Sequence, residues 1–90
     1  MFARKLHVQL RSPSGARDCP LKYLDSFAMR SFTGESRFDD TLPTAPGRLE
    51  AGRDVSLEAL RLALEDWFRR KSYLQPGESV ELLDTRNAQP

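Results

Sequence analysis

Apolar and polar residues alternate at the start of the chain, which is the period of two that a half-buried β-strand shows. The apolar positions are Phe2, Leu6, Val8 and Leu10, and the polar positions between them are Lys5, His7, Gln9 and Arg11. The pattern predicts a strand over residues 4–11, with one face in the core and one cationic face.

The next segment permits two interpretations. Ser12–Gly15 has the composition of a turn, and antiparallel strands are often neighbours in sequence, so a second strand over about 22–32 is our preferred prediction. Leu21, Leu24 and Ala28 also fit one face of a helix that follows Pro20. The sequence therefore leaves residues 16–33 open between strand and helix.

Periodicity fails over residues 34–55, where prolines, glycines and mixed charges interrupt scattered apolar residues. We expect a long irregular loop here. Loops of this length are uncommon in compact domains and are often functional. A binding loop that carries Glu35, Asp39 and Asp40 is one interpretation, and an ordinary irregular connection that includes a short strand at most is the other.

The most regular pattern predicts an amphipathic helix over residues 57–71. Ser56 is a candidate N-cap, and Val55 and Leu60 have the spacing of a hydrophobic staple. The charged face includes Glu65 and Arg69, one turn apart and in the order that favours an ion pair. The expected core face comprises Leu57, Leu60, Ala63, Leu64, Trp67 and Phe68.

A short strand is expected at 79–84, after the turn signal of Pro76 and Gly77. The polar tail at 85–90 is expected to fray. The predicted fold is therefore one small α+β domain over residues 1–90. A two- or three-stranded, mostly antiparallel sheet packs against one amphipathic helix, in the order β-(β)-loop-α-β.

Charge is nearly balanced over the whole chain, with a formal net charge of +1, but it is uneven along it. Residues 1–37 hold seven basic and three acidic groups, whereas residues 38–68 hold three basic and seven acidic groups. Dedicated DNA-binding domains usually have a strong basic excess. The dipolar distribution instead favours a protein partner or a local anionic contact.

Two further features concern the source and the compartment. Arginine outnumbers lysine eleven to three, which fits the codon usage of a high-GC bacterium or phage as well as a functional use of arginine. Cys19 is the single cysteine, so the chain has no internal disulfide and no cysteine-based zinc site. Together with the lack of an apolar run long enough to span a membrane, this predicts a cytoplasmic protein without membrane contact.

Chemistry that would indicate an enzyme is missing from the sequence. His7 is the single histidine, and nothing in its spacing supports a nucleophilic pairing with Cys19. We find no phosphate-binding glycine motif and no recurring metal-ligand spacing. We therefore expect a non-enzymatic protein without a cofactor or a metal.

The expected function is that of a small interaction protein: a regulator, adaptor or inhibitor that binds a larger macromolecule. Alternatives are a nucleic-acid-associated protein with a basic patch, and a structural subunit of a homo-oligomer such as a homodimer. Leu62 projects among charges on the predicted helix, and basic residues gather at its end. The candidate partner-binding residues are Arg61, Leu62, Arg69, Arg70, Lys71, Tyr73, Lys5 and Arg11.

Overall fold

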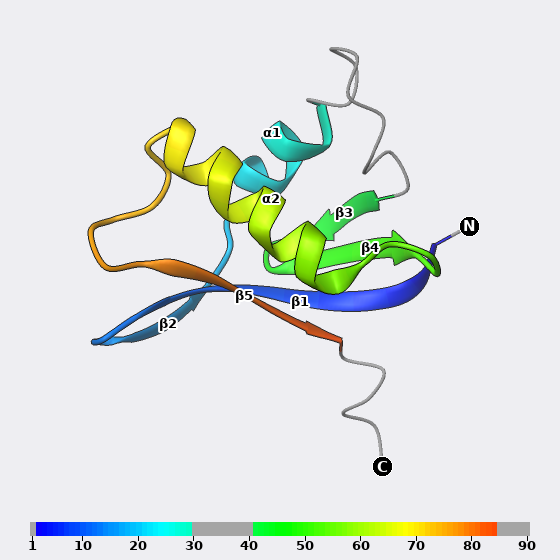
Figure 1. Cartoon of the computed structure of the whole chain (residues 1–90), viewed down its shortest axis with the longest axis horizontal. Coiled ribbons are helices and arrows are strands. Elements are labelled where there is room, and N and C mark those ends of the chain that lie inside the picture. The colour runs from blue at the N-terminus through cyan, green and yellow to red at the C-terminus, as the bar shows by residue number, and fades with distance from the viewer. Residues whose placement is uncertain (1, 30–40, 85–90) are drawn as a thin grey trace.

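The computed structural model describes residues 2–29 and 41–84, which form one antiparallel sheet and two helices (Figure 1). The strands are β1 (Phe2–Ser12), β2 (Gly15–Asp18), β3 (Thr41–Ala45), β4 (Arg48–Gly52) and β5 (Ser79–Asp84). The helices are α1 (Leu21–Met29) and α2 (Leu57–Arg70). The mixed α+β class is confirmed, but the sheet has five strands rather than two or three, and a second helix is present.

Strand β1 is the centre of the sheet. Its one edge pairs with β5, and its other edge pairs first with β4 and then with β2, while β3 extends the sheet beyond β4. The change from β4 to β2 occurs at Val8, whose N–H donates to the Gly47 carbonyl (2.8 Å) and whose carbonyl accepts from the Cys19 N–H (3.1 Å). Every strand pair is antiparallel.

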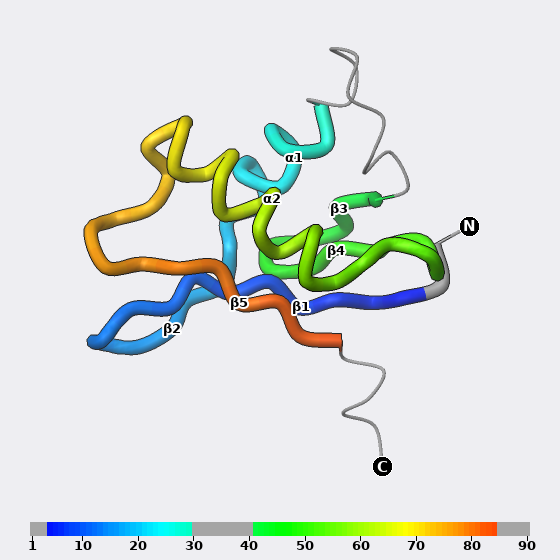
Figure 2. Tube along the Cα trace, in the orientation of Figure 1, coloured from blue at the N-terminus to red at the C-terminus, as the bar shows by residue number. Residues whose placement is uncertain are grey.

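Both helices lie on the same face of the sheet, α2 against β5 and α1 against β3 (Figures 1 and 2). The side chains of Leu6, Val8 and Leu10 on β1 are buried toward them, as the alternation predicts. The core is fully closed to solvent and comprises Leu6, Val8, Leu10, Cys19, Leu24, Phe27, Leu49, Ala51, Leu60, Leu64, Phe68 and Val80.

Helix α2 agrees with the prediction to within one residue. Ser56 is the N-cap, and its Oγ accepts from the backbone N–H of Ala59 (3.3 Å). Phe68 is fully buried. Trp67 packs at the border of the core, and its indole N–H donates to Ser26 Oγ on α1 (3.0 Å), so this residue joins the two helices.

The predicted strand over about 22–32 was wrong for residues 22–29, which belong to α1, and residues 30–32 lie outside the described residues. The helical spacing decides the structure: Leu24 and Phe27 are three residues apart, and both are fully buried. The strand that pairs with β1 across this turn is β2, which starts immediately after Pro13 and Ser14.

The predicted loop over 34–55 was wrong for much of its length, because β3 and β4 form a hairpin there. Pro43 is tolerated because β3 pairs only with β4 among the described strands, and prolines in sheets are confined to edge strands. The turn at Gly47 requires a left-handed backbone, with a φ of 72°. The candidate loop residues Glu35, Asp39 and Asp40, and the tail at 85–90, lie outside the described residues.

Candidate interaction surface

The sheet face opposite the helices is formed by the polar positions of β1 and their neighbours. Lys5, His7, Gln9 and Arg11 alternate with the buried leucines and valine, so they point away from the core. No described helix covers this side of the sheet (Figure 1). We refer to it as the open face.

Charges on the open face are arranged by strand register, so that opposite signs meet. Lys5 lies across from Glu50 on β4. Arg11 donates through Nε to Glu81 Oε1 on β5 (2.8 Å). Opposite charges on neighbouring strands stabilise a sheet. Because these positive and negative side chains are paired, the open face is charged yet has nearly balanced charge.

Asp18 lies in the middle of the open face and contacts residues of two strands. Its Oδ1 lies 2.8 Å from His7 Nε2. The hydrogen bond from His7 is the main cause that lowers the pKa of Asp18, and the positive charge of Arg48 lowers it further. The adjacent Gly47 leaves room for this carboxylate, since a Cβ there would lie 3.0 Å from Asp18 Cγ. Asp18 thus connects side chains of β1 with the start of β4.

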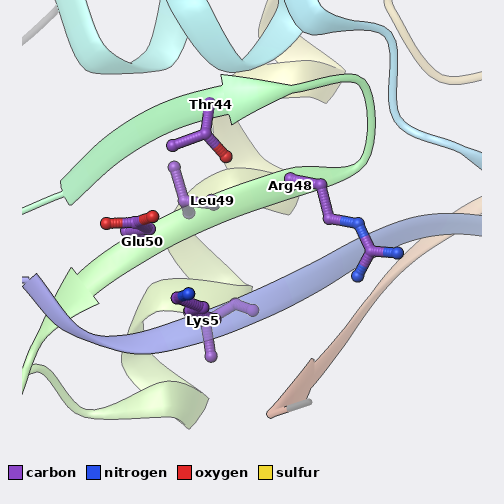
Figure 3. A pocket seen from close by; sticks show the side chains of 6 residues that line it. Lys5, Thr44, Arg48, Leu49 and Glu50 are labelled. Carbon is purple, nitrogen blue, oxygen red and sulfur yellow. The ribbon is translucent and has the colours of Figure 1, made fainter. Parts of the chain in front are cut away.

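A shallow hollow of about 310 Å³ lies on the open face, where β1, β4 and β3 run side by side (Figure 3). Its polar rim comprises Lys5, Thr44, Arg48 and Glu50, and its lining includes Leu6 and Leu49. Figure 3 shows the Arg48 side chain extending over β1, away from Glu50. The hollow therefore presents two cations, one carboxylate and one hydroxyl to any group that enters it.

Two exposed leucines flank these charges. Leu42 on β3 and Leu83 on β5 are each 44% exposed, and both alternate with residues that point toward the helices. Single exposed leucines are common on proteins. Here the two leucines lie on opposite sides of the charged residues, so the open face has exposed apolar surface at both margins.

The basic end of α2 is largely engaged within the chain. Arg69 lies 3.6 Å from Glu65, which confirms the predicted pair, and Arg70 lies 3.0 Å from Asp66. The Lys71 ammonium lies 4.7 Å from the centre of the Trp67 ring. These contacts match the compensation of charge at a helix C-terminus.

The remaining candidates on the helical layer also have contacts within the chain. Tyr73 stacks on Tyr23 with ring centres 4.2 Å apart. Arg61 pairs with Glu58 at 3.1 Å and approaches Glu65 at 3.7 Å. Leu62 is half exposed among these charges, as its position in the sequence suggested.

The structure separates the two predicted basic groups. Lys5 and Arg11 lie on the open face, whereas the basic end of α2 belongs to the helical layer on the other side of the sheet. A single flat basic patch that joins them is therefore not present. A nucleic-acid-associated protein that used both groups would need them on one face, and the described residues do not meet that condition.

His7 and Cys19 also lie on opposite sides of the sheet. Cys19 is fully buried, and burial raises the pKa of its thiol to about 12, so it is a poor nucleophile. Residues 2–29 and 41–84 contain no group of three metal-ligating side chains. In the same part of the chain, neither helix is long and apolar enough to span a membrane.

Comparison with known proteins gives no relative. No family description matches the chain, and neither the curated proteins nor the solved structures include one that is significantly similar. The assignment of function consequently depends on the surface itself.

The sequence identified the open-face residues of β1, two of them as candidate binding residues, but missed those of the neighbouring strands. Lys5 and Arg11 follow from the alternation in β1. Arg48, Glu50 and Leu42 were assigned to a loop, although the alternation of buried Leu49 and Ala51 with Arg48 and Glu50 was a detectable strand signal.

Proposed function

We propose that this chain is a small non-enzymatic interaction protein that acts by binding a larger protein partner, as a regulator, adaptor or inhibitor does. The observation that supports it best is the open face, one whole side of a five-stranded sheet that no described helix covers. Its balanced charges suit a protein surface of mixed charge, because such patterns give specificity and orientation. A polyanion would instead favour a uniformly basic surface.

The hollow on the open face is the proposed centre of recognition. Lys5 and Arg48 offer donors for a carboxylate of the partner, and the arginine fork can bind it in a bidentate manner. Leu42 and Leu83 supply apolar contact at the margins. The proposal places the protein in the cytoplasm, where its single buried thiol would remain reduced.

The experiment is a quantitative capture of partners from lysate of the source cell, carried out in parallel with and without nuclease treatment. A Lys5→Gln/Arg48→Gln variant removes two charges from the open face. An Arg69→Gln/Arg70→Gln variant removes the same charge from the end of α2 and serves as the matched control. Both variants are first checked for folding by circular dichroism.

The proposal expects a stoichiometric protein that the open-face variant loses and the control retains. Loss only in the α2 variant would move the binding surface to the helix end. Recovery of material that disappears on nuclease treatment would favour a nucleic-acid-associated protein and would contradict the proposal.

A further inference from the structure

The outer edge of β5 presents main-chain groups that no described strand pairs. Leu82 lies directly opposite Val8 of β1. The N–H and the carbonyl of Val8 both bond on the other side of β1, to Gly47 and Cys19. Directly opposed residues of an antiparallel pair exchange both hydrogen bonds or neither. The N–H and carbonyl of Leu82 therefore point outward from the sheet.

The same edge is occupied at one point by a side chain. The N–H of Val80 also points outward, and it donates to Glu65 Oε2 on α2 (2.9 Å). This carboxylate stands where the carbonyl of a further strand would be. On pairing with a further strand, the Val80 N–H would exchange Glu65 Oε2 for a carbonyl of that strand, and the N–H and carbonyl of Leu82 would pair beside it.

The three outer edges of the described sheet differ in their capacity for pairing. β3 contains Pro43, which lacks a donor, and β2 has only four residues. β5 has six residues and no proline. Edges with unpaired main-chain groups are templates for strand addition. Among the described edges, β5 is therefore the one best suited to it, although Glu65 already accepts from the Val80 N–H.

The flank of α2 above this edge carries alternating charges. Glu58, Arg61, Glu65 and Arg69 follow one another at helical spacing and form ion pairs along the helix. The contact of Glu65 with Val80 shows that this flank faces β5. An alternating row of this kind is complementary to itself when a second copy runs in the opposite direction. We call it the charged flank.

We propose that β5 pairs antiparallel with β5 of a second copy of this chain, forming a two-fold dimer with a continuous sheet and facing charged flanks. The charges select the register. Helix α2 and β5 run in opposite directions (Figure 1), and Glu65 lies at Val80. Two residues along β5 match about four residues along α2, given rises of about 3.3 and 1.5 Å, so Arg61 lies at Leu82. An axis through Glu81 therefore places Val80 opposite the second Leu82, and Arg61 opposite the second Glu65.

This register brings the two Glu81 side chains together on the open face. Each is already bonded to Arg11 at 2.8 Å, so the seam contains two acidic and two basic groups. Arg11 thereby offsets the repulsion between the carboxylates. An axis through Leu82 would instead place Arg61 opposite the second Arg61, and the charged flanks would repel each other.

The first test is the mass of the purified chain by sedimentation equilibrium over a wide concentration range. The dimer predicts a concentration-dependent rise to twice the mass of the chain. Arg61→Glu and Glu65→Arg variants should each associate about tenfold more weakly, because like charges then face each other. An equimolar mixture of the two variants should regain association, because opposite charges meet again in the mixed dimer.

The second test examines the register by disulfide formation. Directly opposed residues in a non-hydrogen-bonded pair lie about 4.5 Å apart at Cα, within the range for a disulfide. A Glu81→Cys variant should therefore cross-link on mild oxidation. A Leu83→Cys variant is the matched control, since its two copies would be about 13 Å apart. Cys19 is buried and common to both.

A monomeric mass at every concentration would overturn the proposal, and so would association that the variants and their mixture leave unchanged. Cross-linking of the control without cross-linking of the Glu81→Cys variant would place the axis elsewhere and would contradict the register. Assembly beyond a dimer would contradict the closed two-fold arrangement. None of these results bears on the capture of a larger partner through Lys5 and Arg48.

Discussion

The ion pair between Arg17 and Glu78 connects β2 to the residue before β5. The Glu78 side chain is only 5% exposed, and its carboxylate accepts from Arg17 Nε (3.0 Å), Arg17 Nη2 (3.1 Å) and the Gln75 N–H (2.8 Å). The main cause that lowers the pKa of Glu78 is the hydrogen bond from Arg17. Removal of Arg17 leaves a buried carboxylate with one donor.

The expected cost follows from this geometry. Breaking a fully buried pair destabilises a protein by about 3–5 kcal/mol. The Arg17 side chain is 41% exposed, so water partly replaces its contribution. We therefore expect Arg17→Met to lower the free energy of unfolding by about 2 kcal/mol. In a domain of this size that corresponds to a fall in Tm of about 10 °C.

The assay is urea unfolding of the wild type, Arg17→Met, Glu78→Gln and the double variant, followed by the fluorescence of Trp67, the only tryptophan. At neutral pH we expect a coupling energy of about 1–2 kcal/mol between the two residues. Because the folded pKa of Glu78 is lowered, this stabilisation is complete above the unfolded value of about 4.3 and is lost as the pH falls through the folded pKa.

Two results would refute this reasoning. One is a coupling energy at neutral pH that is indistinguishable from zero. The other is a coupling energy that stays constant through acid titration until the protein unfolds, because a charge interaction must disappear when Glu78 is protonated.

Three other predictions concern the core and one turn. Phe68→Ala should lower the free energy of unfolding by about 3–5 kcal/mol in urea titrations, because the ring is fully buried, and a cost near zero would contradict its place in the core. Gly47→Ala should lower Tm more than Gly77→Ala: both have positive φ, but only at Gly47 does the new Cβ meet Asp18, at 3.0 Å. Cys19 should react with a thiol reagent only at the rate of global unfolding, since burial raises its pKa to about 12, and rapid labelling of the folded chain would contradict this.

The elements that the sequence predicts best are those with strong periodicity and local end signals. β1 and β5 agree with the alternation, and α2 begins after the Ser56 cap. For α1, the alternation of Phe27 and Met29 competed with the helical spacing of Leu24 and Phe27. Packing against β3 and α2 decided between them, and a sequence window does not contain those contacts.

Of the open face, only the outward-pointing residues of the central strand β1 could be predicted from the sequence. Alternation in β1 identifies Lys5 and Arg11 as outward residues, but the neighbours of a strand depend on tertiary pairing. Glu50 and Glu81 come from strands about 45 and 70 residues farther along, on opposite edges of β1. Asp18 also lies on the open face because β1 changes its pairing partner at Val8. Nothing in the local sequence indicates that change.

The most direct test of the proposed function is the affinity of the purified partner for the two charge-matched variants, measured by isothermal titration calorimetry. The account predicts that Lys5→Gln/Arg48→Gln raises the dissociation constant by at least about tenfold, as expected for loss of charged contacts at an interface. It also predicts that Arg69→Gln/Arg70→Gln binds like the wild type. An unchanged affinity for the first variant, with a loss for the second, would show that the partner binds the end of α2 and not the open face.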